Sequence, residues 1–323
     1  MCNMPYNTVI LLGPTAVGKT ALGVRIAAAF GWDIISADCR QVYKGLDLGS
    51  GKDLAEYTFQ SRQIPHHLID IVTLEQEYNV FNFQKDFYTL FDDFSQKGKM
   101  PFVVGGTGMY LDSIVRGYDF VPVPENDSLR AELAEKSLAE LGEMLLKLKP
   151  DLHNKTDLLD RNRTIRAIEI QLFMKSDAYK KIREQYRGER KINAFVMGTT
   201  LPRDLLRARI TRRLRERFAQ GMIEEVERLH QNGYSWERLE KLGLEYRYIS
   251  EYLEGKIKTE EDLFVGLNHA IQQFAKRQET WFRSMERKGV AIHWLPPVEN
   301  MEAKYASALK HLQLLYPQEC SSS

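Results

Sequence analysis

A glycine-rich stretch near the N-terminus has the residue types and spacing of a phosphate-binding loop. The stretch Gly13-Pro14-Thr15-Ala16-Val17-Gly18-Lys19-Thr20 fits the pattern G-x-x-x-x-G-K-T. Glycines at both ends let consecutive backbone N–H groups turn toward an anion, and a following helix adds the positive end of its dipole. Lys19 can reach terminal phosphate oxygens, and the Thr20 hydroxyl can bind Mg²⁺. The loop therefore predicts a site for a diphosphate or a triphosphate.

A carboxylate is predicted at the same edge of the fold. The segment Asp33–Asp38 predicts a buried strand that ends in Asp38, shortly after the first predicted helix. In an open parallel sheet, ligand groups lie beyond the carboxyl ends of the strands. We therefore expect Asp38 beside the phosphate loop. The segment Cys39–Gly45 would add polar groups there, unless it is an ordinary surface loop.

A second glycine-rich turn follows another predicted strand. The buried strand Met100–Val104 leads into Gly105-Gly106-Thr107-Gly108, where a helix begins. Glycines let the backbone approach a ligand closely, and Thr107 would place its hydroxyl at the same edge of the sheet. The alternative is a plain strand-to-helix turn without a ligand.

Arginines are concentrated in the helical run that follows Pro202. Helical spacing places Arg209 and Arg213 on one face, with Arg212 adjacent. A guanidinium group suits a diphosphate because it can donate two parallel hydrogen bonds. This run therefore supplies candidate cations for the phosphate site.

The elements that must position these groups follow an α/β pattern. Thr8–Leu12 predicts the strand before the phosphate loop, and Ala21–Phe30 has the periodicity of the helix after it. The other predicted elements are strands at 65–71, 193–200 and 289–294, and helices at 79–94, 202–231, 236–253 and 260–285. We expect a P-loop NTPase-like parallel sheet core flanked by helices.

Residues 119–191 differ from the rest because they contain helix formers and charges and no strand signal. They predict an all-helical insertion in a discontinuous core of residues 1–118 and 192–315, with a disordered tail at 316–323. The insertion ends in the basic stretch Lys180–Lys191. Such a stretch could neutralise nucleic-acid phosphates or could be a solvated helix face.

Composition limits the class of protein. The chain has 323 residues and a net charge of +1, so its overall charge does not decide whether nucleic acid is a partner. Three cysteines are too few for a disulfide framework or a zinc site, and His66 and His67 would point to opposite faces of a strand. Because we find neither a signal peptide nor a membrane-spanning apolar run, we expect a soluble cytoplasmic protein.

Taken together, the motifs resemble those of the tRNA dimethylallyltransferases, also called tRNA isopentenyltransferases. The matching segments, in the family's order, are Gly13–Thr20, Ile35–Tyr43, Pro65–Asp70, Val104–Tyr110, Asp160–Glu169 and Ala275–Phe282. Many unrelated enzymes share the phosphate loop alone, whereas the ordered set is specific. The resemblance implies transfer of a dimethylallyl group from dimethylallyl diphosphate to N6 of the adenine immediately 3′ of the anticodon in tRNA, releasing diphosphate.

The resemblance also implies roles for individual residues. Asp38 matches the general base, Thr107 would orient the reacting groups, and Arg213 would clamp the diphosphate. The implied diphosphate-binding residues are Gly13, Thr15, Ala16, Val17, Gly18, Lys19 and Thr20, and Thr20 would also bind Mg²⁺. The residues implied to bind the anticodon stem-loop of tRNA are Asp38, Cys39, Arg40, Gln41, Thr107, Arg130, Asn162, Arg163 and Arg166. We expect a monomer with no membrane partner.

The chain departs from the family pattern at three places. Cys39 stands where the family usually has serine, beside the implied base. Ile271-Gln272 replaces Thr-Arg, and Gly49–Asp53 replaces the commoner Gly-Thr-Ala-Lys-Pro. These changes indicate a divergent member whose tRNA preference could be shifted.

Three other functions stay open. An adenylate isopentenyltransferase acting on free AMP or ATP would not need the helical insertion with its basic end. A P-loop small-molecule kinase would hold ATP at Gly13–Thr20 and orient its acceptor with Asp38, but the sequence identifies neither a lid arginine nor an adenine-stacking element. A nucleotide-dependent RNA-binding protein would leave Asp38 and Thr107 without chemical roles.

Overall fold

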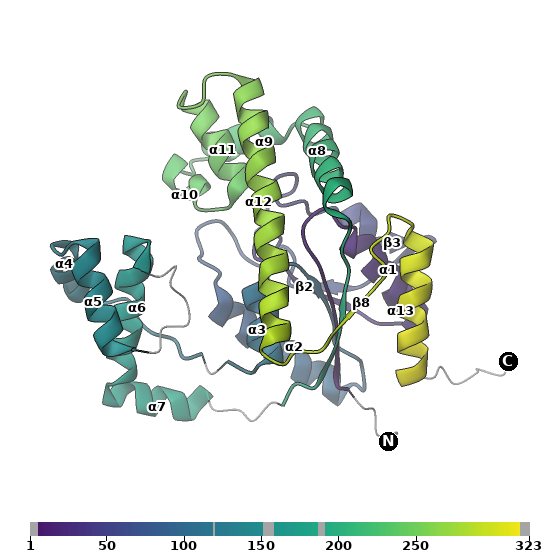
Figure 1. The fold of residues 1–323 in the computed structure, drawn as a ribbon, viewed down its shortest axis with the longest axis horizontal. Helices are drawn as coiled ribbons and strands as arrows, with labels where there is room; N and C mark the ends of the chain where they lie inside the picture. Colours follow the sequence, from purple (N-terminus) through teal and green to yellow (C-terminus); the bar gives the residue numbers. More distant parts are fainter. Residues whose placement is uncertain (1–5, 119, 151–157, 187–190, 317–323) are drawn as a thin grey trace. The chain divides into compact units, whose positions relative to one another are not determined.

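The computed structural model describes residues 6–118, 120–150, 158–186 and 191–316. The chain forms two compact units, Met1–Tyr118 with Lys191–Ser323, and Asp119–Arg190. The larger unit contains a sheet with helices around it, and the described part of the smaller unit is helical (Figure 1).

The larger unit is built on a six-stranded parallel sheet with the order β5-β2-β6-β1-β7-β8. Its strands are β1 (Thr8–Leu12), β2 (Ile34–Ala37), β5 (His66–His67), β6 (Phe102–Gly105), β7 (Ala194–Gly198) and β8 (Ile292–Trp294). Backbone pairing aligns Ala37 with Gly105, Gly105 with Leu12, and Leu12 with Gly198. Because four neighbouring strands end in one row, the residues that follow them lie along one edge. The predicted α/β fold with a parallel sheet core is confirmed.

Helices cover both faces of this sheet. The helices of the larger unit are α1 (Lys19–Phe30), α2 (Val80–Gln96), α3 (Gly108–Val115), α8 (Arg203–Ala219), α9 (Met222–Gln231), α10 (Trp236–Glu240), α11 (Leu244–Leu253), α12 (Glu260–Arg287) and α13 (Met301–Leu315). Val9 and Leu11 of β1 share an apolar core with α1 and α13, whereas Ile10 and Leu12 share one with α2 and α3. Alternating strand residues thus pack on opposite faces, as a parallel sheet buried on both sides requires.

A third apolar core connects helices α8 to α12 with the loops at the carboxyl edge of the sheet. Val17 of the phosphate loop and Leu46 of the segment after β2 are buried in it, together with Ile210, Ile249 and Ile271. Burial of these loop residues fixes the backbone on which the polar groups of the edge are carried.

Glycines divide two of the predicted helices. The run expected at 202–231 breaks between α8 and α9, where Gly221 has φ 92°. The run expected at 236–253 breaks between α10 and α11, where Gly243 has φ 133°. An apolar periodicity that continues across such a residue predicts one helix, but the left-handed backbone at the glycine ends it.

The segment after β2 also differs from the prediction. The strand expected at 65–71 is only β5, because Leu68 and Asp70 have positive φ angles of 61° and 54°. The short 3₁₀ helix η1 (Leu54–Tyr57) and the hairpin β3 (Thr58–Phe59) and β4 (Arg62–Gln63) were not predicted.

A helix that the sequence did not predict follows the last strand. The predicted elements end at 289–294, but α13 lies beyond them and packs against α1 (Figure 1). Arg25 of α1 pairs with both carboxylate oxygens of Glu302, at 2.6 and 2.7 Å. Tyr316, the first residue of the expected disordered tail, is buried and contacts the Trp32 ring edge-on. The rest of that expected tail, 317–323, lies outside the described residues.

The smaller unit contains α4 (Asp127–Ala134), α5 (Leu138–Leu148), α6 (Arg161–Met174) and α7 (Asp177–Tyr186). Leu133, Leu141, Leu145 and Ile168 form its buried apolar core. The residues of this unit that the structure describes form no strand.

Candidate active site

The phosphate loop connects β1 with α1 in the conformation that its glycines predict. Gly18 has φ 87° and is the residue before the first turn of α1, and Ala16 is also left-handed with φ 62°. A Cβ atom at Gly13 would overlap the Thr199 carbonyl oxygen, so only glycine fits there. Lys19 Nζ donates to the Pro14 carbonyl at 2.7 Å, which holds the lysine across its own loop. The residue types of the loop therefore account for its backbone conformation.

A cavity of about 400 Å³ opens beside this loop. Its cationic lining residues are Lys19, Arg209, Arg212, Arg213 and Arg217, and its acidic ones are Asp53, Glu56 and Glu216. Ala16, Gly18 and Thr20 also line it. An excess of positive charge next to a helix N-terminus suits a polyanion such as a diphosphate.

Lys19 lies close to two other predicted site residues. Burial lowers the pKa of Lys19 to about 8; the nearby Asp38 carboxylate opposes this shift, and the Arg213 guanidinium adds to it. The structure therefore brings together a lysine, an arginine and a carboxylate that are far apart in the sequence. The binding of an anion would restore the preference of Lys19 for its charged form.

Arg213 is held at one end. Its Nη2 donates to the Gly51 carbonyl and to Asp53 Oδ2, both at 3.2 Å. Asp53 also pairs with Arg217, whose side chain is more buried than that of Arg213. Because both bonds of Arg213 use Nη2, the remaining edge of its guanidinium can face the cavity.

Asp38 and Thr107 lie at the carboxyl ends of β2 and β6. Asp38 Oδ1 accepts the backbone N–H groups of Arg40 at 2.8 Å and Gln41 at 3.4 Å, which closes a turn after the strand. Thr107 Oγ1 accepts the N–H of Cys39 at 3.1 Å, and its own N–H donates to Ala37 O at 3.2 Å. The hydrogen bond between Cys39 and Thr107 thereby joins the residue after the predicted base to the second glycine turn.

The glycines of the second turn contact protein atoms. A Cβ atom at Gly106 would lie 2.7 Å from Gln278, one at Gly108 would lie 2.5 Å from Trp281, and one at Gly105 would overlap Ala37. We expected these glycines to let the backbone approach a ligand. In the structure they allow close packing, and Thr107 is the residue of this turn that has a polar side chain.

The predicted polar segment after Asp38 is partly occupied by protein contacts. The Gln41 side chain accepts from Ser36 at 3.2 Å and donates to Gly51 O at 3.4 Å. Burial raises the pKa of the Cys39 thiol, which keeps the thiol protonated. The Arg40 side chain lies against Gly243, at the beginning of α11.

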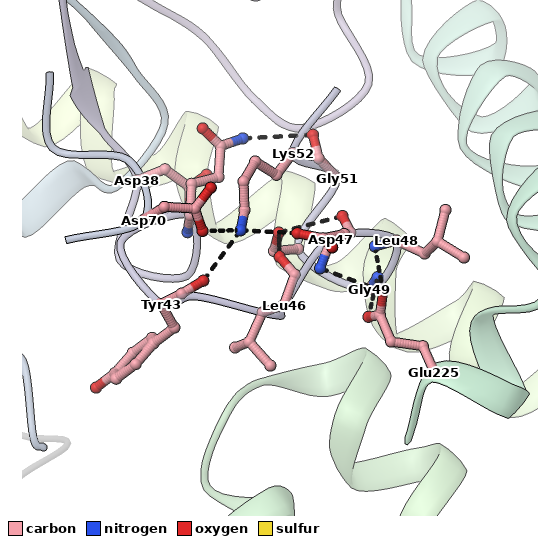
Figure 2. Close-up of polar contacts among 12 residues, drawn as sticks. Asp38, Tyr43, Leu46, Asp47, Leu48, Gly49, Gly51, Lys52, Asp70 and Glu225 are labelled. Carbon is pink, nitrogen blue, oxygen red and sulfur yellow. Dashed lines mark hydrogen bonds and ion pairs between the residues drawn. The ribbon is translucent and has the colours of Figure 1, made fainter. Parts of the chain in front are cut away.

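The loop that departs from the family pattern is fixed from two sides (Figure 2). Lys52 donates to Tyr43 O at 3.0 Å and pairs with Asp47 and Asp70. Glu225 accepts the backbone N–H groups of Asp47, Leu48 and Gly49 at 3.2, 2.7 and 3.1 Å. These bonds hold the loop at the edge of the site, and the loop brings Asp53 into contact with Arg213.

Sequence reasoning missed several residues at this edge. Glu245 lines a smaller cavity with Thr15 and Arg213, and burial raises its pKa to about 7. No sequence pattern indicated it. Asp53 had a signal, since it lies in a segment that departs from the family, and Gln278 lies in a matched motif without an assigned role.

Helix α13 also supports the site. Lys304 is buried and donates to Thr199 Oγ1 at 3.0 Å and to Thr200 O at 3.2 Å, at the end of β7. Met301 lies close to Gly18 of the phosphate loop. The element that the sequence failed to predict therefore packs behind the predicted loop.

The predicted tRNA-binding residues of the smaller unit have different environments. Arg130 and Arg166 both pair with Glu169, whose side chain is only 2% exposed. Asn162 and Arg163 are exposed on α6. The last part of the predicted basic stretch, 187–190, lies outside the described residues. Contacts of these residues with tRNA stay a prediction.

The residues that the structure describes contain neither a metal-binding cluster nor a membrane-spanning helix. Among these residues, no group of three or more His, Cys, Asp or Glu side chains could hold a metal ion. None of the helices formed by the same residues has the length and apolar content of a bilayer-spanning segment.

Known proteins resemble this chain over most of its length. The family model described as IPP transferase matches residues 41–285, and that described as isopentenyl transferase matches residues 6–69. A Treponema denticola protein named tRNA dimethylallyltransferase 2 is 53% identical over 291 residues, covering 90% of this chain and 96% of the relative.

Solved structures agree with the sequence comparison. The full-length tRNA isopentenylpyrophosphate transferase of Bacillus halodurans has a TM-score of 0.68 and 28% identity, covering 96% of each chain. A eukaryotic dimethylallyltransferase acting on tRNA has a TM-score of 0.74 at 21% identity, covering 98% of this chain and 81% of its own, and this likeness shows the fold. The resemblance predicted from the motifs is confirmed: the chain belongs to the IPP transferase family, the tRNA dimethylallyltransferases.

Proposed function

We propose that this protein transfers a dimethylallyl group from dimethylallyl diphosphate to N6 of the adenine immediately 3′ of the anticodon in tRNA. The observation that carries the proposal is the convergence of Gly13–Thr20, Asp38, Thr107 and Arg213 at one edge of the sheet. Relatives named tRNA dimethylallyltransferase support it. Two alternative functions are a small-molecule kinase and an enzyme that prenylates free AMP.

The cationic cavity would stabilise the leaving group. As the bond between the allylic carbon C1 and the diphosphate oxygen breaks, negative charge accumulates on the diphosphate. Lys19 and Arg213 line the cavity beside the N-terminus of α1, so these cations and the first N–H groups of the helix would favour the transition state. Gly13, Thr15, Ala16, Val17 and Gly18 would shape the backbone around the diphosphate.

Asp38 and Thr107 would act on the acceptor. The N6 lone pair forms the new bond to C1, and the Asp38 carboxylate takes the proton that N6 loses. Thr107, bonded to the backbone next to Asp38, would orient the reacting groups. The adenine must leave its stack to reach this edge, which requires a few kcal/mol of unstacking energy.

Residues that fit Mg²⁺ line the phosphate cavity. The Thr20 hydroxyl and the carboxylates of Asp53 and Glu56 are oxygen ligands of the kind that Mg²⁺ prefers. We infer that Thr20 holds the ion, which would neutralise charge on the diphosphate when bound. Asp53 already pairs with two arginines, so it is the weaker candidate of the two carboxylates.

We further infer that the anticodon stem-loop binds through Asp38, Cys39, Arg40, Gln41 and Thr107 of the larger unit and Arg130, Asn162, Arg163 and Arg166 of the smaller one. Such contacts would be made mostly to phosphates and to RNA shape. The proposed enzyme acts as a monomer in the cytoplasm, where tRNA is its substrate.

One labelling experiment tests the function. The protein and Mg²⁺ are incubated with radiolabelled dimethylallyl diphosphate and either unmodified tRNA or AMP, and in parallel with ATP and candidate acceptors. We expect label in tRNA. Label only in AMP, or ATP turnover without prenyl transfer, would contradict the proposal.

A substitution tests the role of Asp38. Asp38→Ala should lose prenyl transfer and keep most of the tRNA affinity, because Asp38 is one of nine residues proposed to contact the anticodon stem-loop and a carboxylate does not bind RNA phosphates. Single-turnover transfer and filter binding measure the two quantities. A near wild-type rate in this variant would show that Asp38 is not the base.

A further inference from the structure

The buried side chain of Gln278 on α12 links the two glycine-rich turns of the site. Its Oε1 accepts the backbone N–H of Thr15 at 2.8 Å, and its Nε2 donates to the carbonyl of Gly106 at 2.8 Å. Thr15 belongs to the phosphate loop after β1, and Gly106 belongs to the turn after β6. One amide therefore bridges two loops that follow neighbouring strands.

The orientation of this amide is fixed by its partners. The Thr15 N–H can only donate and the Gly106 carbonyl can only accept, so the oxygen and nitrogen of Gln278 cannot exchange places. Gln278 is 8% exposed, so water does not readily replace either bond. Of Glu, Gln and Met, whose side chains are similar in length, only glutamine is neutral and has both a donor and an acceptor.

Neighbouring residues of α12 contact the same loops. Glu279 accepts a hydrogen bond from Thr200 at 3.0 Å, beyond the end of β7, and the Trp281 ring packs against Gly108. A Cβ atom at Gly106 would lie 2.7 Å from Gln278 Nε2 and 3.4 Å from Lys19 Nζ, so the bridge is next to the phosphate-binding lysine. The helix thus holds three loops of the carboxyl edge at once.

We propose that Gln278 is a positioning residue that sets the separation between the phosphate loop, which would hold the donor, and the turn carrying Thr107, which would orient the acceptor. The inference rests on the proposed function and deepens it. Carbon C1 of the donor must meet N6 in line with the leaving oxygen, and a displacement of about 1 Å can slow such a step about a hundredfold. Gln278 acts through the two loops and touches neither substrate.

Two substitutions separate positioning from binding. Gln278→Met keeps the length and removes both hydrogen bonds, whereas Gln278→Glu keeps an acceptor for Thr15 but turns a carboxylate oxygen toward the Gly106 carbonyl. For both variants we expect kcat to fall about a hundredfold, since the reacting atoms are no longer held in register. For Gln278→Met the affinity for inorganic diphosphate should stay within about threefold, because the cations of the cavity are unchanged. Gln278→Glu adds a negative charge next to Lys19, so its diphosphate affinity should also fall.

The matched controls are Gln273→Met and Gln273→Glu. Gln273 is on the same helix and its hydrogen bond is a 3.5 Å contact with His269, outside the bridge. These controls should keep the wild-type kcat. A kcat of Gln278→Met within threefold of wild type would overturn the proposal, as would parallel losses of kcat and diphosphate affinity in that variant.

Hydrogen exchange gives a readout that does not depend on activity. Peptides covering 13–20 and 105–109 should exchange faster together in both Gln278 variants and remain unchanged in the Gln273 controls. If one loop loosens without the other, Gln278 does not couple them. If the wild-type protein transfers no prenyl group, the proposed function fails, while the exchange data still decide the coupling. If Gln278→Met does not fold, Gln278→Glu and the protection of the Thr15 amide in wild type decide it.

Discussion

The phosphate loop and the second glycine turn share a local plan but differ in what surrounds their glycines. Each connects a buried strand to a helix at the same edge of the sheet. Gly18 has φ 87°, and a Cβ atom there would lie at least 3.5 Å from its neighbours. Gly106 and Gly108 lack a positive φ, and a Cβ atom at either would collide with a side chain of α12.

The difference shows that glycine serves two purposes at one edge. In the first loop it permits a left-handed backbone that leaves N–H groups and Lys19 facing a cavity. In the second it lets α12 approach the strand end closely, so that Gln278 and Trp281 fill the space. The first loop therefore lines a cavity with an excess of cationic side chains, and the second holds Thr107 beside the strand end of Asp38.

The largest effect is expected from Lys19→Met. The substitution keeps the apolar stem and removes the cation proposed to face the leaving group, so kcat/KM for dimethylallyl diphosphate should fall about a thousandfold. Steady-state transfer to tRNA measures it. The control is Lys97→Met, which removes the exposed lysine that caps the C-terminus of α2 and pairs with Asp93. Equal activities of the two variants would show that Lys19 has no part in the reaction.

Glycine-to-alanine substitutions in the two turns should have opposite signatures. Gly108→Ala forces a methyl group toward Trp281, so the free energy of unfolding should fall by about 1–3 kcal/mol and kcat about tenfold. The affinity of Gly108→Ala for inorganic diphosphate should stay at the wild-type value. Gly18→Ala strains a left-handed residue by about 1–3 kcal/mol and should weaken diphosphate binding more than tenfold. Denaturant unfolding and isothermal calorimetry measure both variants.

The two variants are each other's control. If Gly108→Ala also weakened diphosphate binding by more than tenfold, the second turn would belong to the phosphate site. If Gly18→Ala bound diphosphate normally, the left-handed conformation would not matter for the anion. Either result would remove the distinction between the turns.

Residue patterns predicted the site better than they predicted its supports. The strand–glycine–helix signals of Gly13–Thr20 and Gly105–Gly108 placed both turns at one edge, since strand ends of a parallel sheet coincide. Helix α13 and residue Glu245 had no such signal, because their positions depend on packing between distant segments. For the glycines of the second turn, the sequence leaves both a ligand-facing role and a plain turn open, because glycine alone does not indicate what approaches it.

The pH dependence of diphosphate binding should report on Lys19 of the phosphate loop. Burial lowers the pKa of Lys19 to about 8, so in the free protein Lys19 loses its charge as the pH rises through 8. The ratio of wild-type to Lys19→Met affinity cancels the ionisation of the ligand itself. We expect this ratio to fall by up to about tenfold per pH unit above 8 and to stay constant below 7. A ratio that is constant to pH 10 would contradict the lowered pKa.

The smallest effect is expected from Thr107→Val, which tests what the second turn contributes beyond packing. The substitution keeps the side-chain shape and removes the acceptor for the Cys39 N–H, so unfolding free energy should fall by about 1–2 kcal/mol. Because Thr107 would also orient the reacting groups, kcat should fall about fivefold with diphosphate affinity unchanged. Thr107→Ser retains the hydroxyl and should restore both quantities. A loss of stability without any loss of kcat in Thr107→Val would make the turn purely structural, leaving the chemistry to Asp38 and the phosphate loop.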